Sequence, residues 1–310
     1  MTTLLVSQSN FDQHQTPVGH PERADRIAAV EAGLAGPRFA ALERRIAPEG
    51  DLSLARLVHD DGYIEALARL RPAEGIVRID EDTFISAGSL DAVATALGAG
   101  LTALEAVALG EATNAFCAVR PPGHHAERGR PMGFCLINTI AVVAREAQRK
   151  FGAERVAIID FDVHHGNGTE DIFKDDPSVL YASSHQWPLY PGTGDPRFTG
   201  ANNTIVNVGL EAGSGTRAMR AAYEDRIFPA IDAFRPDFVL ISAGFDADAR
   251  DPLAGLDWGP ADFSWVTDGL CRLAARHCDG RVVSMLEGGY DLTALADDAA
   301  AHVEMLLARG

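Results

Sequence analysis

Short apolar runs alternate along this chain with longer segments of helical period, and that alternation restricts the fold more than any other feature. The short runs are rich in Val and Ile and are expected to be buried strands: residues 155–163, 179–183, 204–208, 238–243 and 282–286. The longer segments have apolar residues every three or four positions and are expected to be helices: residues 89–109, 136–151, 216–234, 260–278 and 292–309. This order predicts an α/β fold, a parallel sheet with helices on both faces.

Length and charge restrict the organisation of the chain further. No repeat, low-complexity tract or Pro/Ser-rich linker divides the 310 residues, so residues 1–310 are expected to form a single domain. The formal net charge of −17 argues against nucleic acid and anionic membranes as partners, because both would repel an acidic protein. A homo-oligomer is compatible with the sequence, which contains nothing that decides the oligomeric state.

The cysteines and the N-terminal residues predict a cytoplasmic protein. The chain has four cysteines and no C-x-x-C pair, so neither a disulfide framework nor a structural zinc site is expected. The first residues lack a basic segment followed by an apolar one, and we find no apolar run of the roughly 18 residues that a membrane span requires.

Two pairs of adjacent histidines stand out among the polar residues. Residues 120–133 read RPPGHHAERGRPMG, and residues 160–168 read DFDVHHGNG. Imidazoles transfer protons and bind metals near neutral pH, carboxylates are charged metal ligands, and glycines let the backbone turn sharply around a bound group. These segments therefore have the composition of an active site.

The polar residues of interest follow predicted strands. Asp160, Asp162 and His164 close the strand at 155–163, Asp246 follows 238–243, and the sequence EGGY, ending at Tyr290, follows 282–286. Ligands of open α/β sheets bind beyond the carboxyl ends of the strands, so these side chains are expected to meet at one edge. The segment 186–203 is expected to be a long loop beside them.

Asp162, His164 and Asp246 are the candidate metal ligands. In an extended segment residues two apart point to the same side, so D-x-H places a carboxylate and an imidazole together. Asp246 is the natural third ligand, and the set leaves one tetrahedral position open, as in catalytic zinc sites. An isolated D-x-H is more often a turn or a helix cap. Here the neighbouring HHGNG sequence favours the metal site.

His124 and His125 are the candidate proton-transfer groups, since they follow a rigid Pro-Pro-Gly turn. A single histidine is more often a core residue, and a catalytic one needs an acceptor for its second ring nitrogen. Asp160 and Asn167 are suitable acceptors. Tyr290 is either a buried ring or a residue of the site, and the two glycines before it favour the site.

These motifs resemble those of the histone deacetylase family, which has the arginase–deacetylase fold. The resemblance covers nearly the whole chain, in the order HPER (20–23), RPPGHH, GFCLIN, DFDVHHGNGT, YPGTGD, SAGFDA and EGGY. Asn167 and the segment DEDTFISAGS at 80–89 are similar to the class II branch and its bacterial deacetylase-like amidohydrolases.

The resemblance implies a catalytic mechanism. Zinc would be bound by Asp162, His164 and Asp246. His125, paired with Asn167, would be the principal general base and acid, and His124, paired with Asp160, would act mainly through its charge. Tyr290 would donate to the oxygen of the amide and of the tetrahedral intermediate.

The resemblance also implies how the substrate and a second ion are bound. Phe134 and Tyr190 would line a narrow tunnel for an acyl-lysine chain, with Gly133 keeping one side open and Arg23 at the inner end. Leu253 and Asp82 would also contact the substrate. Potassium would be bound by the Asp160 and Ser183 side chains and by the backbone carbonyls of Asp162, His164 and Ser184.

The expected activity is therefore hydrolysis of acetylated or otherwise acylated lysine, or of a related amine, and three alternatives stay open. An acetylpolyamine amidohydrolase shares the core, but its relatives tend to have an acidic residue or an insertion at the rim, where this chain has Leu253. A ureohydrolase would need a second set of acidic ligands; Asp248 follows Asp246, yet no second D-x-H of that kind is present. A non-catalytic acyl-amine binding protein would have lost a ligand, the base or the tyrosine, and none is lost.

Overall fold

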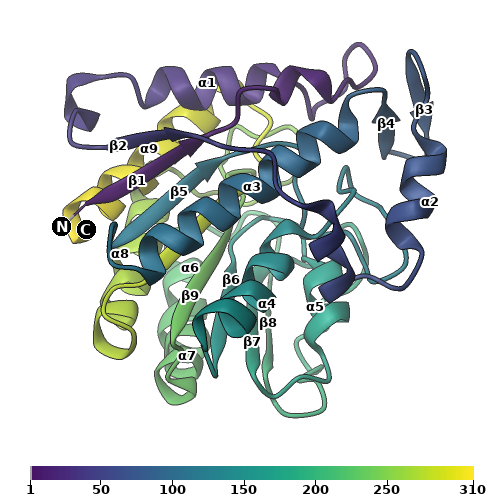
Figure 1. Cartoon of the computed structure of the whole chain (residues 1–310). Helices are drawn as coiled ribbons and strands as arrows, with labels where there is room; N and C mark the ends of the chain where they lie inside the picture. The colour runs from purple at the N-terminus through teal and green to yellow at the C-terminus, as the bar shows by residue number, and fades with distance from the viewer. Residues whose placement is uncertain (1) are drawn as a thin grey trace.

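The computed structural model describes residues 2–310, and its centre is a sheet of eight parallel strands (Figure 1). The order across the sheet is β2-β1-β5-β10-β9-β6-β7-β8. The strands are β1 (Thr3–Ser7), β2 (Glu43–Ile46), β5 (Asn114–Ala118), β6 (Val156–Asp160), β7 (Val179–Gln186), β8 (Ile205–Leu210), β9 (Phe238–Ala243) and β10 (Val282–Leu286). A separate antiparallel pair, β3 (Ile76–Arg78) and β4 (Phe84–Ser86), lies near α2.

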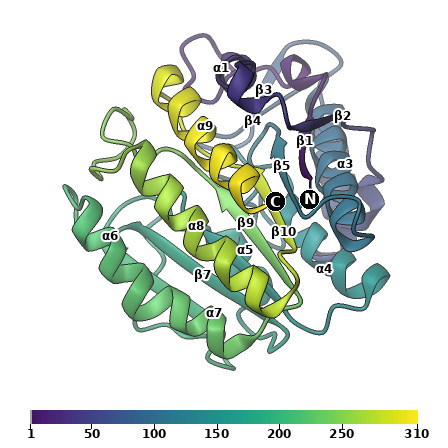
Figure 2. The same cartoon turned by 90° about the vertical axis from the view of Figure 1, so that its left-hand side faces the viewer.

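Helices cover both faces of the sheet, as the alternation predicts (Figures 1 and 2). The α-helices are α1 (Asp25–Gly33), α2 (Tyr63–Leu70), α3 (Ser89–Ala108), α4 (Thr139–Phe151), α5 (Asn167–Phe173), α6 (Thr216–Ala222), α7 (Phe228–Phe234), α8 (Pro260–His277) and α9 (Leu292–Arg309). Successive residues of β5 point to opposite faces of the sheet and enter different cores. Cys117 packs under α3 and α4, and Phe116 packs under α1 and α9. Burial on both faces explains why the central strands β5, β10, β9 and β6 are largely apolar.

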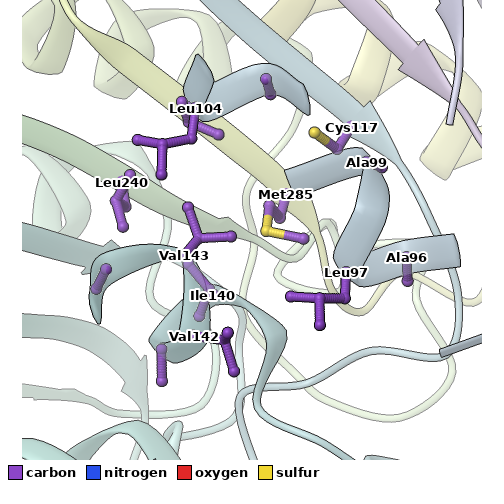
Figure 3. Close-up of a cluster of buried hydrophobic side chains, with 14 of the residues drawn as sticks. Ala96, Leu97, Ala99, Leu104, Cys117, Ile140, Val142, Val143, Leu240 and Met285 are labelled. Carbon is purple, nitrogen blue, oxygen red and sulfur yellow. The ribbon is translucent and has the colours of Figure 1, made fainter. Parts of the chain in front are cut away.

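The core beneath α3 and α4 is closely packed (Figure 3). Leu97 from α3, Val143 from α4 and Met285 from β10 meet there and are almost fully buried. At Gly100 of α3 a Cβ would lie 2.6 Å from Cγ2 of Val143, so a larger residue would separate the helices.

Helix α3 contradicts one expectation from the sequence. It is long and apolar enough to cross a membrane by length and composition alone, although no such run was expected. In the fold, 78% of its apolar window is buried. A helix that is apolar on all sides is typical of a core element packed between other layers, which accounts for its composition.

The boundaries agree with the sequence where the apolar pattern is strongest. Strands β9 and β10 and helix α9 have the expected bounds. The expected helix 216–234 contains a π-helical turn at Tyr223–Ile227, and α4 begins at Thr139 because the Asn138 side chain caps it by accepting from Ala141 N. Strands β1, β2 and β5 and helix α1 were not predicted. Strand β2 has four residues, three of them charged, and the nine-residue α1 is too short for a clear helical period.

Candidate active site

The carboxyl ends of the central strands bring the expected polar residues together. Strands β10, β9, β6 and β7 are neighbours in the sheet. Strand β6 ends at Asp160, which pairs in register with Ser183 of β7 and with Ser242 of β9. Segments far apart in sequence therefore meet at one edge, as predicted for an open parallel sheet.

Asp162, His164 and Asp246 form a buried cluster whose ligand atoms all lie within 4.8 Å of one another. Nδ1 of His164 is 3.2 Å from Oδ1 of Asp162 and 3.1 Å from Oδ2 of Asp246. The geometric reason differs from the expected one, because the strand ends at Asp160 and a turn follows. Asp160 Oδ1 accepts from Asp162 N at 3.1 Å, and Asp162 Oδ1 accepts from His164 N at 2.9 Å.

The charges of this cluster fit a divalent cation. Burial alone opposes ionisation of His164, but its hydrogen bonds to Asp162 and Asp246 raise its pKa to about 10. Burial and the charge of Asp162 raise the pKa of Asp246 to about 7. A proton is thus retained among two carboxylates and an imidazole, in the place where a cation would balance the negative charge. Oxygen and nitrogen donors in this number are those of a catalytic zinc site, and metal binding would release the proton.

Two glycines leave room for the carboxylates. A Cβ at Gly244 would overlap the Asp162 side chain, and one at Gly288 would lie 2.8 Å from Cγ of Asp246. Gly288 N also donates to Asp162 Oδ2 at 2.8 Å. Gly244 of SAGFD and Gly288, the first glycine of EGGY, are therefore required by the approach of the backbone to the ligands.

The two adjacent histidines have different partners and opposite ionisation. His124 Nδ1 bonds to Asp160 Oδ2 at 2.9 Å, and His125 Nδ1 bonds to Asn167 Oδ1 at 2.8 Å. Burial disfavours the charged form of His124, but Asp160 and Asp162 raise its pKa well above the usual value. Burial, together with the charges of His124 and His164, lowers the pKa of His125 well below it. His125 is therefore the neutral ring that is able to accept a proton.

A pocket of about 250 Å³ opens from this cluster to the surface. Five residues expected to contact the substrate line it together with the inner residues of the site: Asp82, Gly133, Phe134, Tyr190 and Leu253, with His125, His164 and Tyr290. The Phe134 and Tyr290 rings are 5.7 Å apart edge to face, and the Tyr190 ring stands edge to face 5.3 Å from His125. The structure thus brings these residues together, while their roles in binding stay predictions.

The prediction that Arg23 lies at the inner end of the pocket is wrong. Arg23 precedes α1, its side chain is 44% exposed, and it pairs with Asp25 at 3.1 Å. Arg26, three residues later, is fully buried instead, with its guanidinium 5.0 Å from the centre of the Tyr290 ring. Its Nε donates to Gly289 O at 2.7 Å. The buried arginine is therefore Arg26, three residues after Arg23, and the position of the HPER motif in the sequence did not reveal this difference.

Arg26 is held in a buried ion network that the sequence analysis missed. Glu22 accepts from Arg26 Nη1 at 3.3 Å and from Arg120 Nε and Nη2, each at 2.7 Å. All three side chains are fully buried. The sequence contained one signal for this network. Glu22 lies in the motif HPER and Arg120 begins the motif RPPGHH, and charged residues that are buried occur with partners of opposite charge.

Two further carboxylates position the catalytic segments. Glu287 Oε2 accepts from Gly123 N at 2.6 Å and from His124 N at 3.2 Å, and so fixes the turn before the histidine pair. Asp251 accepts from Leu253 N at 3.0 Å and from Tyr290 N at 2.7 Å, which joins the pocket rim to the tyrosine loop. Asp251 has no sequence pattern of its own, and Glu287 begins the EGGY motif, but the backbone donors that define the role of each are set by the fold.

Comparison with known proteins agrees with this geometry. The family model of the histone deacetylase domain matches residues 20–306. The chain belongs to the histone deacetylase family. It is 39% identical over 301 residues to "Histone deacetylase 10, chloroplastic" of Oryza sativa subsp. japonica, covering 91% of this chain and 68% of the relative. It is 36% identical to a "Probable deacetylase" of Archaeoglobus fulgidus, covering 94% and 82%. The crystal structure of the HDA15 HD domain superposes with a TM-score of 0.92 at 35% identity, covering 99% and 89%.

The backbone at Gly133 generates a testable prediction. Gly133 has φ of +56°, and a Cβ there would lie 2.7 Å from Cγ of His125. We expect Gly133→Ala to lower kcat/KM by about 10–100-fold, because misplacing a catalytic group by a fraction of an ångström to 1 Å is costly. Gly110→Ala is the control: φ is +73°, but no atom lies within 4 Å of the added Cβ. Activity assays and thermal unfolding of both variants separate the clash from backbone strain, and full activity in Gly133→Ala would contradict the prediction.

Proposed function

We propose that this deacetylase-family protein is a zinc-dependent amidohydrolase that removes acetyl or other short acyl groups from acylated lysine or a related amine. One observation supports the proposal: the buried cluster of Asp162, His164 and Asp246 adjoins a pocket that is lined by His164 together with His125 and Tyr290. This is the set of groups that amide hydrolysis requires.

The metal would be held by Asp162, His164 and Asp246, whose donor atoms and charge fit zinc. The chemistry such an ion supplies when bound is polarisation of the amide carbonyl and a lower pKa for the attacking water. Potassium is part of the proposal as well, on the support that Asp160 and Ser183 lie opposite each other in neighbouring strands.

The protein groups supply proton transfer and charge stabilisation. His125 is neutral and lines the pocket, so it takes the proton of the water and later returns a proton to the departing amine. His124 stays charged beside Asp160 and stabilises negative charge nearby. Burial raises the pKa of Tyr290 well above its usual value, so its hydroxyl stays protonated and donates to the oxyanion.

The walls of the pocket suit an extended apolar chain that ends in a polar amide. Phe134, Tyr190 and Leu253 supply apolar surface to the lining, and Asp82 supplies a carboxylate. A lysine side chain carrying a neutral acyl amide fits this arrangement, since its methylene groups lose water to apolar rings and its amide reaches the catalytic groups.

The metal content tests the first part of the proposal. We expect one divalent ion per chain, with metal–nitrogen distances of about 2.0–2.1 Å for zinc. A chelator should abolish hydrolysis, and added zinc or cobalt should restore it. Asp246→Asn should lose the metal, whereas Asp248→Asn should retain it, because the Asp248 carboxylate bonds instead to Arg250 Nε at 2.8 Å. Two manganese ions per chain, measured by elemental analysis, would favour the ureohydrolase alternative.

The rim residue Leu253 tests the substrate class. Acetyl-lysine peptides should exceed acetylspermidine in kcat/KM, because the internal ammonium of the polyamine would lose water beside Leu253, which supplies no counter-charge at that position of the rim. Leu253→Glu should shift the ratio toward the polyamine by about tenfold or more, whereas Leu253→Met, which stays apolar, should leave it unchanged. A wild-type preference for the polyamine would favour the acetylpolyamine alternative.

Tyr290 tests the mechanism. Tyr290→Phe should lower kcat on acetyl-lysine by roughly 10²–10³ while zinc content and fold are retained, because the lost hydrogen bond strengthens in the transition state. A trifluoroacetyl substrate has an activated carbonyl and should lose less. His125→Ala should impair both substrates severely, since it removes proton transfer. Near-full activity of Tyr290→Phe on acetyl-lysine would show that the ring only packs.

A further inference from the structure

We propose that Glu127 is a positioning residue for catalysis, which fixes the amide of Asn167 and thereby holds His125 in the tautomer that accepts a proton. This inference rests on the proposed function and adds a third member to its His125–Asn167 pair. The observation behind it is a continuous chain of hydrogen bonds. His125 Nδ1 bonds to Asn167 Oδ1 at 2.8 Å, and Asn167 Nδ2 donates to Glu127 Oε1 at 2.7 Å.

An asparagine amide has two nearly equal ends with opposite hydrogen-bonding roles. When Oδ1 faces His125, Nδ1 of the ring carries the proton and Nε2 has a free lone pair. When Nδ2 faces His125, Nδ1 must accept, the ring proton moves to Nε2, and the base is lost. The orientation of the Asn167 amide therefore decides whether His125 is able to accept a proton at Nε2.

Glu127 separates these two orientations. Its carboxylate only accepts, so it bonds to Nδ2 of Asn167 and would face a carbonyl oxygen if the amide were reversed. The other protein contact of this nitrogen is Met132 Sδ at 3.2 Å, a weak acceptor. Without Glu127, only this weak contact with Met132 would keep Nδ2 turned away from His125 and the amide oxygen turned toward it.

The neutral amide explains why an outer carboxylate is needed here. A carboxylate at position 167 would accept from His125 with either oxygen and would need no orientation, and Asp160 does this for His124. At 167 the chain has an asparagine, so the acceptor role must be imposed from outside. Glu127 is placed for this by the turn in which its N donates to Arg130 O at 3.0 Å, and its side chain is 28% exposed.

The decisive experiment compares the same substitution in two backgrounds on an acetyl-lysine peptide. In the wild-type background Glu127→Ala should lower kcat by about 10–100-fold with KM changed less than about twofold, and Glu127→Gln should lower it less. In an Asn167→Asp background two carboxylates face each other, so Glu127→Gln should now raise kcat by donating to Asp at 167. A purely structural role for Glu127 predicts the same sign in both backgrounds, and that result would overturn the inference.

Arg130→Gln is the matched control. Arg130 Nε lies 3.4 Å from Glu127 Oε2, and its side chain is 61% exposed. Removing it leaves the bond from Asn167 to Glu127 in place, so kcat should stay within about twofold of wild type. A loss as large as that of Glu127→Ala would assign the effect to the surface ion pair and overturn the inference.

A second readout does not depend on turnover. Long-range ¹H–¹⁵N spectra of the histidine rings in the zinc-loaded protein report which ring nitrogen carries the proton. His125 should carry it on Nδ1 in the wild type and partly or wholly on Nε2 in Glu127→Ala, with the signals of His124 unchanged. An unchanged His125 tautomer would overturn the inference. Absence of hydrolysis in the wild type, with the tautomer shift observed, would instead overturn the proposed function alone.

Discussion

The burial of charge at one end of the sheet is the constraint on which the site depends. Carboxylates of four different segments are almost completely removed from water there: Glu22, Asp160, Asp162, Asp246 and Glu287. Such groups are stable only with cations or hydrogen-bond donors close by. Arg26 and Arg120 neutralise Glu22, His124 neutralises Asp160, and backbone N–H groups satisfy Glu287. The remaining pair, Asp162 and Asp246, accepts from the backbone N–H groups of Gly288 and Val163 and shares a proton at His164, and the proposed metal would take the position of that proton.

The overall architecture could be predicted from the sequence because both sheet faces are buried. Continuous apolar runs and long amphipathic segments identify β9, β10 and α9 to the residue. The edge of the fold could not be predicted in this way. Strand β2 (Glu43–Ile46) reads ERRI, in which two of the four side chains are exposed, so charged residues conceal a parallel strand paired with β1. Pairing with β1 determines this strand, and the pairing involves residues about 40 positions apart.

Much of the site could be predicted because its ligands follow strand ends, where order along the chain becomes proximity in space. Asp162, His164, Asp246 and Tyr290 belong to this group. Five other pocket residues were expected only from the resemblance to the family: Asp82, Gly133, Phe134, Tyr190 and Leu253. The residues that were missed act on backbone atoms or through a neighbour: Arg26, Asp251 and Glu287. Their partners are carbonyls and N–H groups of loops, which leave no pattern in side-chain sequence. Arg23 precedes α1 and is partly exposed, whereas Arg26 lies in the first turn of α1 and is buried. The residue at which α1 begins therefore decides which arginine points into the protein.

His124 and His125 have the same side chain, and only their different neighbours give them different functions. The ring centres of His124 and His125 are 4.1 Å apart, so two positive charges at that distance would repel strongly in a buried site. A carboxylate beside His124 and an amide beside His125 decide which ring carries the charge. If residue 167 were also a carboxylate, its negative charge would raise the pKa of His125. The ring would then be protonated more often at neutral pH and would be a poorer proton acceptor. Burial and the charges of His124 and His164 keep the second ring neutral, and the asparagine adds no negative charge that would oppose them. Because this side chain is a neutral amide, it must be oriented by a group outside the pair.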